Sequence, residues 1–449
     1  MRIAMIGTGY VGLVSGVCFS DFGHSVVCVD TDGGKIERLK KGEVPIYEPG
    51  LAAVMERNVE AGRLAFSTNL AAALQGADAA FIAVGTPSRR GDGQADLSYV
   101  MAAARDIAQR ADDGLVVVVK STVPIGTNRR MAEEIRSVAP TLKFDIASNP
   151  EFLREGAAIE DFMRPDRVVF GCDTERAAQV MRDIYRPLFL REFPIVVTDL
   201  ESAEMIKYAA NAFLATKITF INEIASLCER VGADVREVAR GIGLDGRIGK
   251  TFLHAGPGYG GSCFPKDTRA LARTAQEYGR PLHIVETVIK SNEDAKRRAV
   301  EKIFELCGDR VGGKTIAVLG VTFKPDTDDM RESPALTIVP ALIGGGATVR
   351  VVDPKGRAEG EALLPSVQWE TDPYAAAEGA DMIVLLTEWN AFRALDLSRL
   401  AQGMRNRCFV DLRNVYPTDS LRAAGFEAVA SVGRSGFDIR DDLHAVAAE

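Results

Sequence analysis

The first and last parts of the chain repeat one pattern of apolar strands, each followed by a turn. Three pairs of segments correspond: residues 3–7 and 314–320, residues 25–30 and 348–353, and residues 76–83 and 379–386. Short apolar runs that alternate with helical stretches are typical of parallel sheets covered by helices. The sequence therefore predicts an α/β fold: two Rossmann-like domains with parallel sheets, joined by a long central helix and an all-helical middle segment.

The first half carries a glycine-rich turn between its first expected strand, residues 3–6, and a helix that runs to about residue 22. Gly7, Gly9 and Gly12 have the spacing G-x-G-x-x-G, with Tyr10 and Val11 inside the motif. The first glycine permits a tight turn, the second lets a pyrophosphate approach the backbone, and the third allows close helix–strand packing. Because a helix amino end also attracts phosphate, the segment predicts a dinucleotide site.

An acidic residue, Asp30, ends the second expected strand about twenty residues after the glycines. A carboxylate at this place binds a ribose 2′-hydroxyl and would repel a 2′-phosphate, so NAD is favoured over NADP. The glycines alone would also fit a plain tight turn. The flanking strand, helix and acid together favour the cofactor site.

Polar residues follow the next strands of the first half, which we expect at residues 79–84, 115–119, 144–147 and 168–171. Thr86, Thr122 and Glu151 lie just after three of them. Ligands of such sheets bind at the carboxyl ends of the strands, so these three residues are candidate site residues. Taken singly, each also fits a turn or a helix cap.

A long, mostly apolar helix is expected from residue 200 to about residue 231. It is too apolar to be solvated all round, which suits a spine between domains or a dimer seam. Lys207 and Asn211 are four residues apart and therefore share one face. Lys207 could instead extend its ammonium group into solvent.

Cys263 follows two glycine-rich loops and precedes an expected helix that starts near Asp267 and runs toward residue 278. A helix amino end and the neighbouring positive charge of Lys266 would both lower the pKa of the thiol. A thiolate adds to an aldehyde and creates a second carbon from which a hydride can leave. A lone cysteine is more often a small buried apolar residue, and it is the surrounding loop that favours a nucleophile.

The second half lacks the glycine triplet, and Lys324 stands in the corresponding turn. This half is therefore expected to bind something other than a second dinucleotide. A lysine there suits a phosphate or sugar oxygen, although an exposed lysine in a loop needs no function. With 449 residues, the chain is predicted to divide into an NAD-binding domain (1–199), a central helical dimerisation domain (200–300) and a carboxyl-terminal domain (301–449) that binds the second ligand.

Composition and charge exclude several classes of function. The net charge of −8 provides no electrostatic footprint for nucleic acid or for an anionic membrane. The seven cysteines lack the paired spacings of zinc sites, so no metal is expected, and free thiols indicate a reducing cytoplasm. An uninterrupted apolar run long enough to span a membrane is also missing from the sequence.

Seven further segments, together with the amino-terminal glycines, resemble the UDP-glucose/GDP-mannose dehydrogenase family of nucleotide-sugar dehydrogenases. The matching segments are residues 85–87, 121–124, 149–156, 164–168, 207–213, 260–267 and 323–334. The resemblance covers nearly the whole chain. It implies a cytoplasmic homodimer that oxidises the C6 alcohol of a UDP-sugar, UDP-glucose before others, to the carboxylate of UDP-glucuronate in two NAD-dependent steps.

The same resemblance assigns roles to individual residues. Cys263 would capture the intermediate aldehyde as a thiohemiacetal, which is oxidised to a thioester and then hydrolysed. Lys207, Asn211 and Asp267 would surround the reacting oxygen and an ordered water, with Lys207 stabilising an oxyanion. Glu151 and Thr122 would position or deprotonate water, and the resemblance leaves open which base acts at which step.

The resemblance also implies the lining of two binding sites. The NAD site would be lined by Asp30, Lys35, Thr86, Thr122, Glu155, Lys266 and Arg331. The sugar nucleotide would contact Glu151, Phe152, Leu153, Arg154, Glu155, Lys207, Asn211, Phe252, Leu253, His254, Ala255, Gly256, Gly260 and Lys324. Arg247 would reach the substrate of a neighbouring subunit.

Three alternatives stay open at this point. GDP-mannose and UDP-N-acetylmannosamine dehydrogenases share these motifs, and specificity depends on the shape of the pocket. A two-electron β-hydroxyacid dehydrogenase shares the dinucleotide fold and a Lys-x-x-x-Asn pair, but it needs neither Cys263 nor a second Rossmann-like half. A non-catalytic NAD-binding module would bind ligand without producing NADH.

Overall fold

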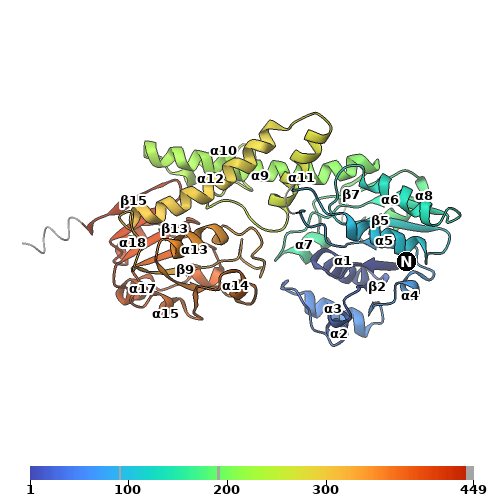
Figure 1. Cartoon of the computed structure of the whole chain (residues 1–449), viewed down its shortest axis with the longest axis horizontal. Helices are drawn as coiled ribbons and strands as arrows, with labels where there is room; N and C mark the ends of the chain where they lie inside the picture. The colour runs from blue at the N-terminus through green and yellow to red at the C-terminus, as the bar shows by residue number, and fades with distance from the viewer. Residues whose placement is uncertain (90–92, 190–192, 441–449) are drawn as a thin grey trace, which may run out of the picture. The chain divides into compact units, whose positions relative to one another are not determined.

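The computed structural model describes residues 1–89, 93–189 and 193–440, and the chain divides into two compact units (Figure 1). Unit 1 comprises residues 1–210 and 269–280, and unit 2 comprises residues 211–268 and 281–449. Two helices contribute residues to both units: α9 (Leu200–Val231) and α11 (Phe264–Glu277). The three-domain division drawn from the sequence stays a prediction.

Within the described residues, unit 1 contains an eight-stranded sheet in the order β3-β2-β1-β4-β5-β6-β7-β8. All neighbouring strands are parallel except β6 and β7. The strands are β1 (Arg2–Ile6), β2 (Ser25–Val29), β3 (Leu64–Ser67), β4 (Ala79–Ile82), β5 (Leu115–Val119), β6 (Phe144–Ser148), β7 (Val168–Cys172) and β8 (Ile195–Thr198). The parallel Rossmann-like sheet predicted for the first half is confirmed.

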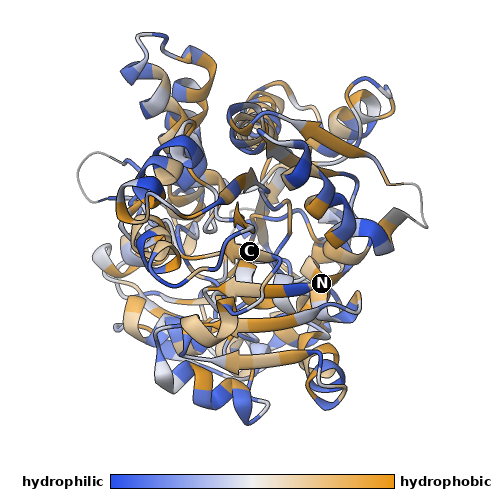
Figure 2. Cartoon of the chain, turned by 90° about the vertical axis from the view of Figure 1, so that its right-hand side faces the viewer, coloured by the Kyte–Doolittle hydropathy of each residue, from blue (hydrophilic) through white to orange (hydrophobic). Residues whose placement is uncertain are grey.

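Helices connect these strands and cover the sheet. They are α1 (Tyr10–Asp21), α2 (Gly33–Lys40), α3 (Leu51–Glu60), α4 (Leu70–Leu74), α5 (Ser98–Ala108), α6 (Thr127–Val138), α7 (Ala158–Met163) and α8 (Glu175–Phe189). The central strands are buried along their whole length, as the unbroken apolar run of β5 shows. In Figure 2 the strands carry mostly the hydrophobic colour, while hydrophilic residues gather on helices and loops.

Unit 2 contains the helical middle segment. Beyond its share of α9 and α11, its helices are α10 (Val235–Gly243) and α12 (His283–Leu306). Helix α9 has the predicted bounds. Helix α11 begins at Phe264 rather than near Asp267, and Cys263 therefore lies directly before its first residue, as predicted.

The rest of unit 2 is a second α/β layer. Among the described residues its sheet has seven strands in the order β11-β10-β9-β12-β13-β14-β15. These are β9 (Thr315–Leu319), β10 (Thr348–Val352), β11 (Gln368–Trp369), β12 (Met382–Leu385), β13 (Cys408–Asp411), β14 (Ala428–Ser431) and an antiparallel edge, β15 (Arg434–Asp438). The helices are α13 (Ala335–Gly344), α14 (Arg357–Leu363), α15 (Pro373–Ala377), α16 (Asn390–Arg393), α17 (Leu397–Gly403) and α18 (Thr418–Ala423). The first strands follow the order of unit 1, which confirms the predicted repeat.

No helix in the described parts of the chain combines the length and the apolar character needed to cross a membrane.

Candidate active site

The glycine turn of unit 1 has the geometry that a dinucleotide phosphate requires. Gly7 adopts a φ of +100°, and its N–H donates to the carbonyl of Val29 at 2.8 Å. A Cβ on Gly12 would lie 2.0 Å from the carbonyl oxygen of Gly7, so a larger residue could not sit there. Around Gly9, at the amino end of α1, no described atom lies within 4 Å of a Cβ position. A pyrophosphate therefore fits against this turn.

Asp30 stands directly after β2, beside the turn. Its Oδ2 accepts from the backbone N–H and hydroxyl of Thr8 at 2.9 and 2.7 Å and from Lys35 Nζ at 3.1 Å. Burial alone would raise the pKa of this carboxyl group, but the hydrogen bonds from Thr8, Asp32 and Lys35 outweigh burial and lower the pKa to about 2. The carboxylate is therefore ionised at neutral pH and can accept a hydrogen bond from a ribose hydroxyl.

A buried ion pair joins two other predicted residues of unit 1. Lys207 Nζ on α9 lies 3.1 Å from Glu151 Oε1, and both side chains are almost fully buried. Lys207 Nζ also lies 5.3 Å from the centre of the Phe152 ring. Glu151 Oε2 accepts from the backbone N–H of Leu153 at 2.5 Å. The structure thus brings together a cation and a carboxylate at the carboxyl end of β6, where they could move a proton or steady a developing negative charge.

Thr122 lies at the carboxyl end of β5, in a loop that other residues hold in place. Its carbonyl accepts from the hydroxyl of Thr86 at 2.9 Å. The backbone N–H groups of Gly126 and Asn128, at the end of the same loop, donate to the carboxylate of Glu204 on α9 at 2.6 and 2.9 Å. Burial raises the pKa of Glu204. Sequence reasoning missed Glu204, although it lies one turn before Lys207 on the same helix.

A second residue that sequence reasoning missed, Glu48, connects the glycine turn to the loop that follows Glu151. The buried carboxylate of Glu48 accepts from the backbone N–H groups of Gly156 and Ala158 at 2.7 and 2.8 Å, and from the hydroxyl of Tyr10. Glu48 lies in a loop far away in the sequence, and no local pattern signals its role.

Lys120, at the end of β5, is a fully buried lysine that the sequence analysis did not single out. Its Nζ donates to Asn149 Oδ1 at 3.2 Å and to the hydroxyl of Tyr185 at 3.3 Å. The pKa of Lys120 is lowered to about 8, chiefly by burial; the nearby charge of Lys207 acts in the same direction and Glu151 in the opposite one. Lys120 is thus close enough to Glu151 and Lys207 of the predicted site for their charges to act on it.

The depressed pKa of Lys120 predicts a pH dependence of stability. Between pH 8 and about 10.5 the unfolded chain binds more protons than the folded chain, so the free energy of unfolding should rise with pH in this window. The gain is about 3 kcal/mol, because one pKa unit corresponds to about 1.4 kcal/mol. Below pH 8 the folded protein carries the full cost of the buried ammonium group.

Denaturant unfolding at several pH values between 7.5 and 10.5 would measure this rise. The variant Lys120→Met should be more stable than the unmodified protein at pH 7.5, and the difference should shrink as the pH increases. Lys143→Met, at an exposed lysine, is the control and should leave the pH profile unchanged. A profile for Lys120→Met that matches the unmodified protein would contradict the prediction.

In unit 2, Cys263 caps the amino end of α11. Its carbonyl accepts from the backbone N–H of Asp267 at 2.8 Å, which is the first hydrogen bond of the helix, and its Sγ lies 3.6 Å from the Ser262 hydroxyl. The thiol is partly exposed. Because the positive end of the helix dipole favours a thiolate, this is a suitable place for a nucleophilic sulfur.

Asp267, in the first turn of the same helix, is held by two predicted partners. Its Oδ2 accepts from Asn211 Nδ2 at 2.6 Å, and its Oδ1 pairs with Lys266 Nζ at 2.5 Å. Asn211 and Asp267 are buried. Asn211 stands four residues after Lys207 on α9, so one helix carries both polar groups.

The predicted sugar-nucleotide loop of unit 2 lies against a residue that sequence reasoning missed. A Cβ on Gly256 would lie 3.3 Å from Arg413 Nη1, and Arg413 Nη2 donates to the carbonyl of Phe323 at 3.1 Å. Lys324 follows Phe323, so two cationic side chains stand at this turn, of which Arg413 also pairs with Glu388 at 3.1 Å. Such a pair suits the oxygens of a diphosphate. Arg413 follows β13 by two residues, and that position at a strand end was the available signal.

The second half also carries an aspartate, Asp353, at the position that corresponds to Asp30. Asp353 follows β10, and its Oδ2 accepts from the backbone N–H groups of Val321 and Thr322 at 2.7 and 3.1 Å. The indole N–H of Trp389 also donates to this oxygen, at 3.3 Å, and Oδ1 accepts from two further backbone N–H groups. Asp30 accepts from the corresponding Thr8 and Asp32 groups, so these bonds alone do not separate the two halves, and the ligand of the second half stays a prediction.

For several predicted site residues the structure gives the position and the contacts but not the role in binding. Lys266 and Arg331, which were expected at the NAD site, belong to unit 2, where Arg331 pairs with Asp329 at 2.6 Å. Arg154 pairs with Asp161, and the exposed Arg247 pairs with Asp245. His254 is exposed, whereas Leu253 and Ala255 are buried. The parts these residues play in binding stay predictions, as does that of Glu155.

Sequence models of one family match three consecutive parts of the chain. The UDP-glucose/GDP-mannose dehydrogenase family matches with its NAD binding domain at residues 1–189, its central domain at residues 201–294 and its UDP binding domain at residues 317–418. The match supports the assignment of the glycine turn and Asp30 to NAD.

Similar proteins span almost the entire chain. A UDP-glucose 6-dehydrogenase of Rhizobium meliloti is 57% identical and covers 97% of this chain and 100% of its own length, and one of Bacillus subtilis is 47% identical over 96% and 93%. Among solved structures, a UDP-glucose dehydrogenase from Pyrobaculum islandicum is similar with a TM-score of 0.89 at 41% identity, covering 96% and 98%. A UDP-D-ManNAc dehydrogenase from Pyrococcus horikoshii has a TM-score of 0.85 at 27% identity, covering 97% and 99%.

Proposed function

Because the chain belongs to the UDP-glucose/GDP-mannose dehydrogenase family, we propose that it oxidises the C6 alcohol of UDP-glucose to a carboxylate and forms UDP-glucuronate. Its NAD-binding domain supplies the cofactor site, at the glycine turn and Asp30. The choice of UDP-glucose is supported by the identity of 57% to a UDP-glucose 6-dehydrogenase. Free thiols and the absence of paired cysteine spacings favour the cytoplasm as its location.

The proposed mechanism rests on one observation, the position of Cys263 at the amino end of α11, next to the hydrogen-bonded pair of Asn211 and Asp267. Bound at the glycine turn, NAD would supply the hydride acceptor for each of two oxidations, so that each sugar would yield two NADH. In the first, the alcohol loses its proton to a base and becomes an aldehyde. The Cys263 sulfur then adds to the aldehyde carbon, whose oxygen takes up a proton, and a thiohemiacetal forms.

The second oxidation converts the thiohemiacetal to a thioester, which water hydrolyses to the carboxylate and the free thiol. Lys207 is assigned to the oxyanion that develops on the sugar oxygen, since a buried ammonium group stabilises such a charge strongly. Asp267 and Asn211 are assigned to the attacking water. Glu151, which is paired with Lys207, and Thr122 are assigned to positioning or deprotonating water around the thioester steps.

A count of NADH produced per sugar tests this proposal. With limiting UDP-glucose and excess NAD, the purified protein should form two NADH per sugar. A two-electron dehydrogenase would form one or none, and a binding module none. Faster or equal turnover of GDP-mannose or UDP-N-acetylmannosamine would overturn the choice of substrate while leaving the chemistry in place.

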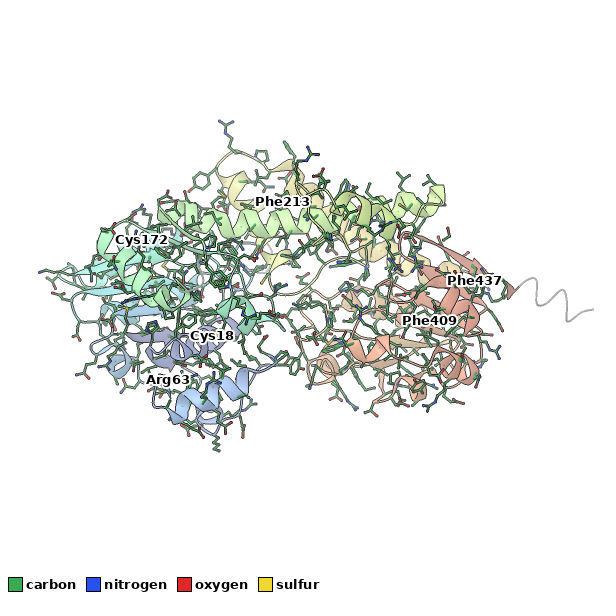
Figure 3. The ribbon with its side chains drawn as sticks, turned by 180° about the vertical axis from the view of Figure 1, so that it is seen from behind. Cys18, Arg63, Cys172, Phe213, Phe409 and Phe437 are labelled. Atoms are coloured by element: carbon green, nitrogen blue, oxygen red, sulfur yellow. The ribbon has the colours of Figure 1, made fainter. Side chains whose placement is uncertain are left out.

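We further propose that two copies of the chain pair through α9. Three large apolar side chains recur at intervals of seven residues along this helix and are exposed: Phe213 (66%), Phe220 (50%) and Leu227 (58%). Figure 3 marks Phe213 on α9. Apolar side chains that repeat at this interval form the seam between paired helices. The exposed Arg247 would then be available to a neighbouring subunit.

The variant Phe220→Asp should separate the dimer into monomers, because it places a charge in the middle of the seam. Light scattering after size-exclusion chromatography would measure the mass. Tyr99→Asp, at an exposed aromatic residue of α5, is the control and should stay dimeric. If the unmodified protein is itself monomeric at micromolar concentration, the seam has no such role.

A further inference from the structure

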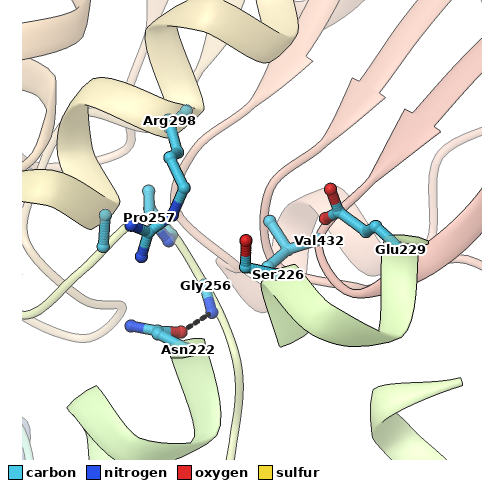
Figure 4. A pocket seen from close by; sticks show the side chains of 9 residues that line it. Asn222, Ser226, Glu229, Gly256, Pro257, Arg298 and Val432 are labelled. Carbon is cyan, nitrogen blue, oxygen red and sulfur yellow. Dashed lines mark hydrogen bonds between the residues drawn. The ribbon is translucent and has the colours of Figure 1, made fainter. Parts of the chain in front are cut away.

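The segment of residues 256–259 in unit 2 is held at both ends by buried asparagines. Asn222 Oδ1 on α9 accepts from the backbone N–H of Gly256 at 2.8 Å (Figure 4). Asn292 on α12 makes two bonds with Tyr259: its Oδ1 accepts from the N–H at 2.8 Å and its Nδ2 donates to the carbonyl at 3.1 Å. Both asparagines are at least 95% buried. The segment is thus fixed by side chains rather than by a neighbouring strand.

The two helices that carry these asparagines are joined to each other. Ser291 of α12 donates to Glu223 of α9 at 2.7 Å, and Lys302 of α12 pairs with Glu229 of α9 at 2.9 Å. Asn222 and Asn292 are therefore carried by two helices that are bonded to each other. The packing of α9 against α12 sets the distance between the two places, Gly256 and Tyr259, where the asparagines hold the segment.

From Tyr259, contacts lead to Cys263. The Tyr259 ring is buried and meets the Phe264 ring edge-on, with centres 6.0 Å apart and planes at 87°. It packs in a small apolar cluster with Ala215 and Val288. Phe264 is the first residue of α11 and follows Cys263 directly. A shift of Tyr259 would therefore move the residue next to the thiol.

The opposite end of the segment leads to a different place. Gly256 lies against Arg413 Nη1, next to the turn that carries Lys324. A change in the position of Gly256 would thus alter the surface next to Arg413 and Lys324. The Tyr259–Phe264 contact would stay in place, because Asn292 holds Tyr259 separately.

Asn222 also borders a small cavity with polar walls. Its Nδ2 is buried and has no hydrogen-bond partner among the described residues. A cavity of about 30 Å³, lined by Ser226, Glu229 and Arg298, adjoins it (Figure 4). Within the described residues, the hydrogen bond that this amide makes is the one its Oδ1 accepts from Gly256.

We propose that Asn292 and Asn222 are positioning residues with separate tasks: Asn292 sets the place of Cys263 through Tyr259, and Asn222 sets the sugar-nucleotide surface through Gly256. This inference rests on the proposed function for the identity of its substrate. It predicts that changes at Asn292 affect kcat and that changes at Asn222 affect KM. If the two asparagines only stabilised the fold, their substitutions would not affect the two constants separately.

Steady-state kinetics and alkylation of the thiol test both tasks. Asn292→Ala should lower kcat with UDP-glucose about tenfold, with KM changed less than threefold. Asn292→Asp keeps the acceptor for the Tyr259 N–H, so its kcat should lie between those of Asn292→Ala and the unmodified protein. Asn222→Leu should raise KM about tenfold with kcat changed less than twofold. The rate at which iodoacetamide modifies Cys263, followed by mass spectrometry without substrates, should change at least threefold in both Asn292 variants and stay constant in Asn222→Leu.

Asn58→Ala is the matched control, since Asn58 is a buried asparagine of unit 1 that bonds to a backbone carbonyl and lies outside the predicted site. It should lower the melting temperature without changing kcat, KM or alkylation. If the folded Asn292 variants keep the unmodified kcat and alkylation rate, or if both asparagines affect kcat and KM alike, the inference is wrong. Should Asn292→Ala fail to fold, Asn292→Asp decides.

Failure of the proposed function would be visible separately. In that case the unmodified protein would form no NADH from UDP-glucose, while alkylation of Cys263 and calorimetric binding of UDP would still decide the tasks of Asn292 and Asn222.

Discussion

Replacing Cys263 by serine is expected to lower the rate of UDP-glucuronate formation about a thousandfold or more. A serine hydroxyl at the amino end of α11 remains protonated at neutral pH, so it cannot add to the aldehyde as a thiolate does. The thiohemiacetal and thioester are then lost, while the first oxidation needs neither. The variant should therefore form at most one NADH per sugar.

Absorbance at the NADH wavelength with limiting UDP-glucose, together with chromatography of the sugar product, would measure this. The variant should bind UDP-glucose with an affinity close to that of the unmodified protein, because the serine is almost the same size. Cys307→Ser, at a partly buried thiol of unit 2 outside the site, is the control and should keep a yield of two NADH. Unchanged turnover by Cys263→Ser would rule out the covalent route.

Replacing Lys207 by methionine is expected to lower kcat by a factor of about 100 to 1000, the usual effect of removing one donor to a developing oxyanion. The change also breaks the buried pair with Glu151 and leaves a carboxylate without its counter-charge. Breaking such a pair costs about 3–5 kcal/mol of stability. Activity and stability should thus fall together in this variant.

The double variant Lys207→Met/Glu151→Gln separates the two effects. It removes both charges, so most of the lost stability should return, as measured by denaturant unfolding. The activity should stay low, because the donor to the oxyanion is still missing. Recovery of activity together with stability would show that Lys207 serves the fold rather than the reaction.

The parts of the site that could be predicted from the sequence are those whose residues lie close together in the chain. The glycine turn, Asp30 and the loop before Cys263 each combine a local spacing with a nearby strand or helix, and the structure places each of them at the end of such an element. The start of α11 was less clear because Pro265 stands in its first turn. Proline fits there, since the first N–H groups of a helix have no partner inside it.

The supporting residues could not be predicted, because their partners lie far away in the sequence. Glu48 binds the N–H of Gly156, 108 residues later, and Asn222 reaches Gly256 across 34 residues. A carboxylate or an amide alone in a helix or loop looks like an ordinary surface residue. Its task becomes visible only when the packed fold shows which backbone group it satisfies.

The glycine triplet at Gly7, Gly9 and Gly12, which the turn after β9 lacks, has a consequence for the timing of the proposed reaction. A chain with one such turn would hold one NAD at a time, yet the proposed reaction would consume two equivalents for each sugar. On this route the spent dinucleotide would have to leave and a fresh one arrive before the second oxidation. Throughout this exchange the proposed bond to Cys263 would tether the half-oxidised sugar, so that no reactive aldehyde is released while the protein waits.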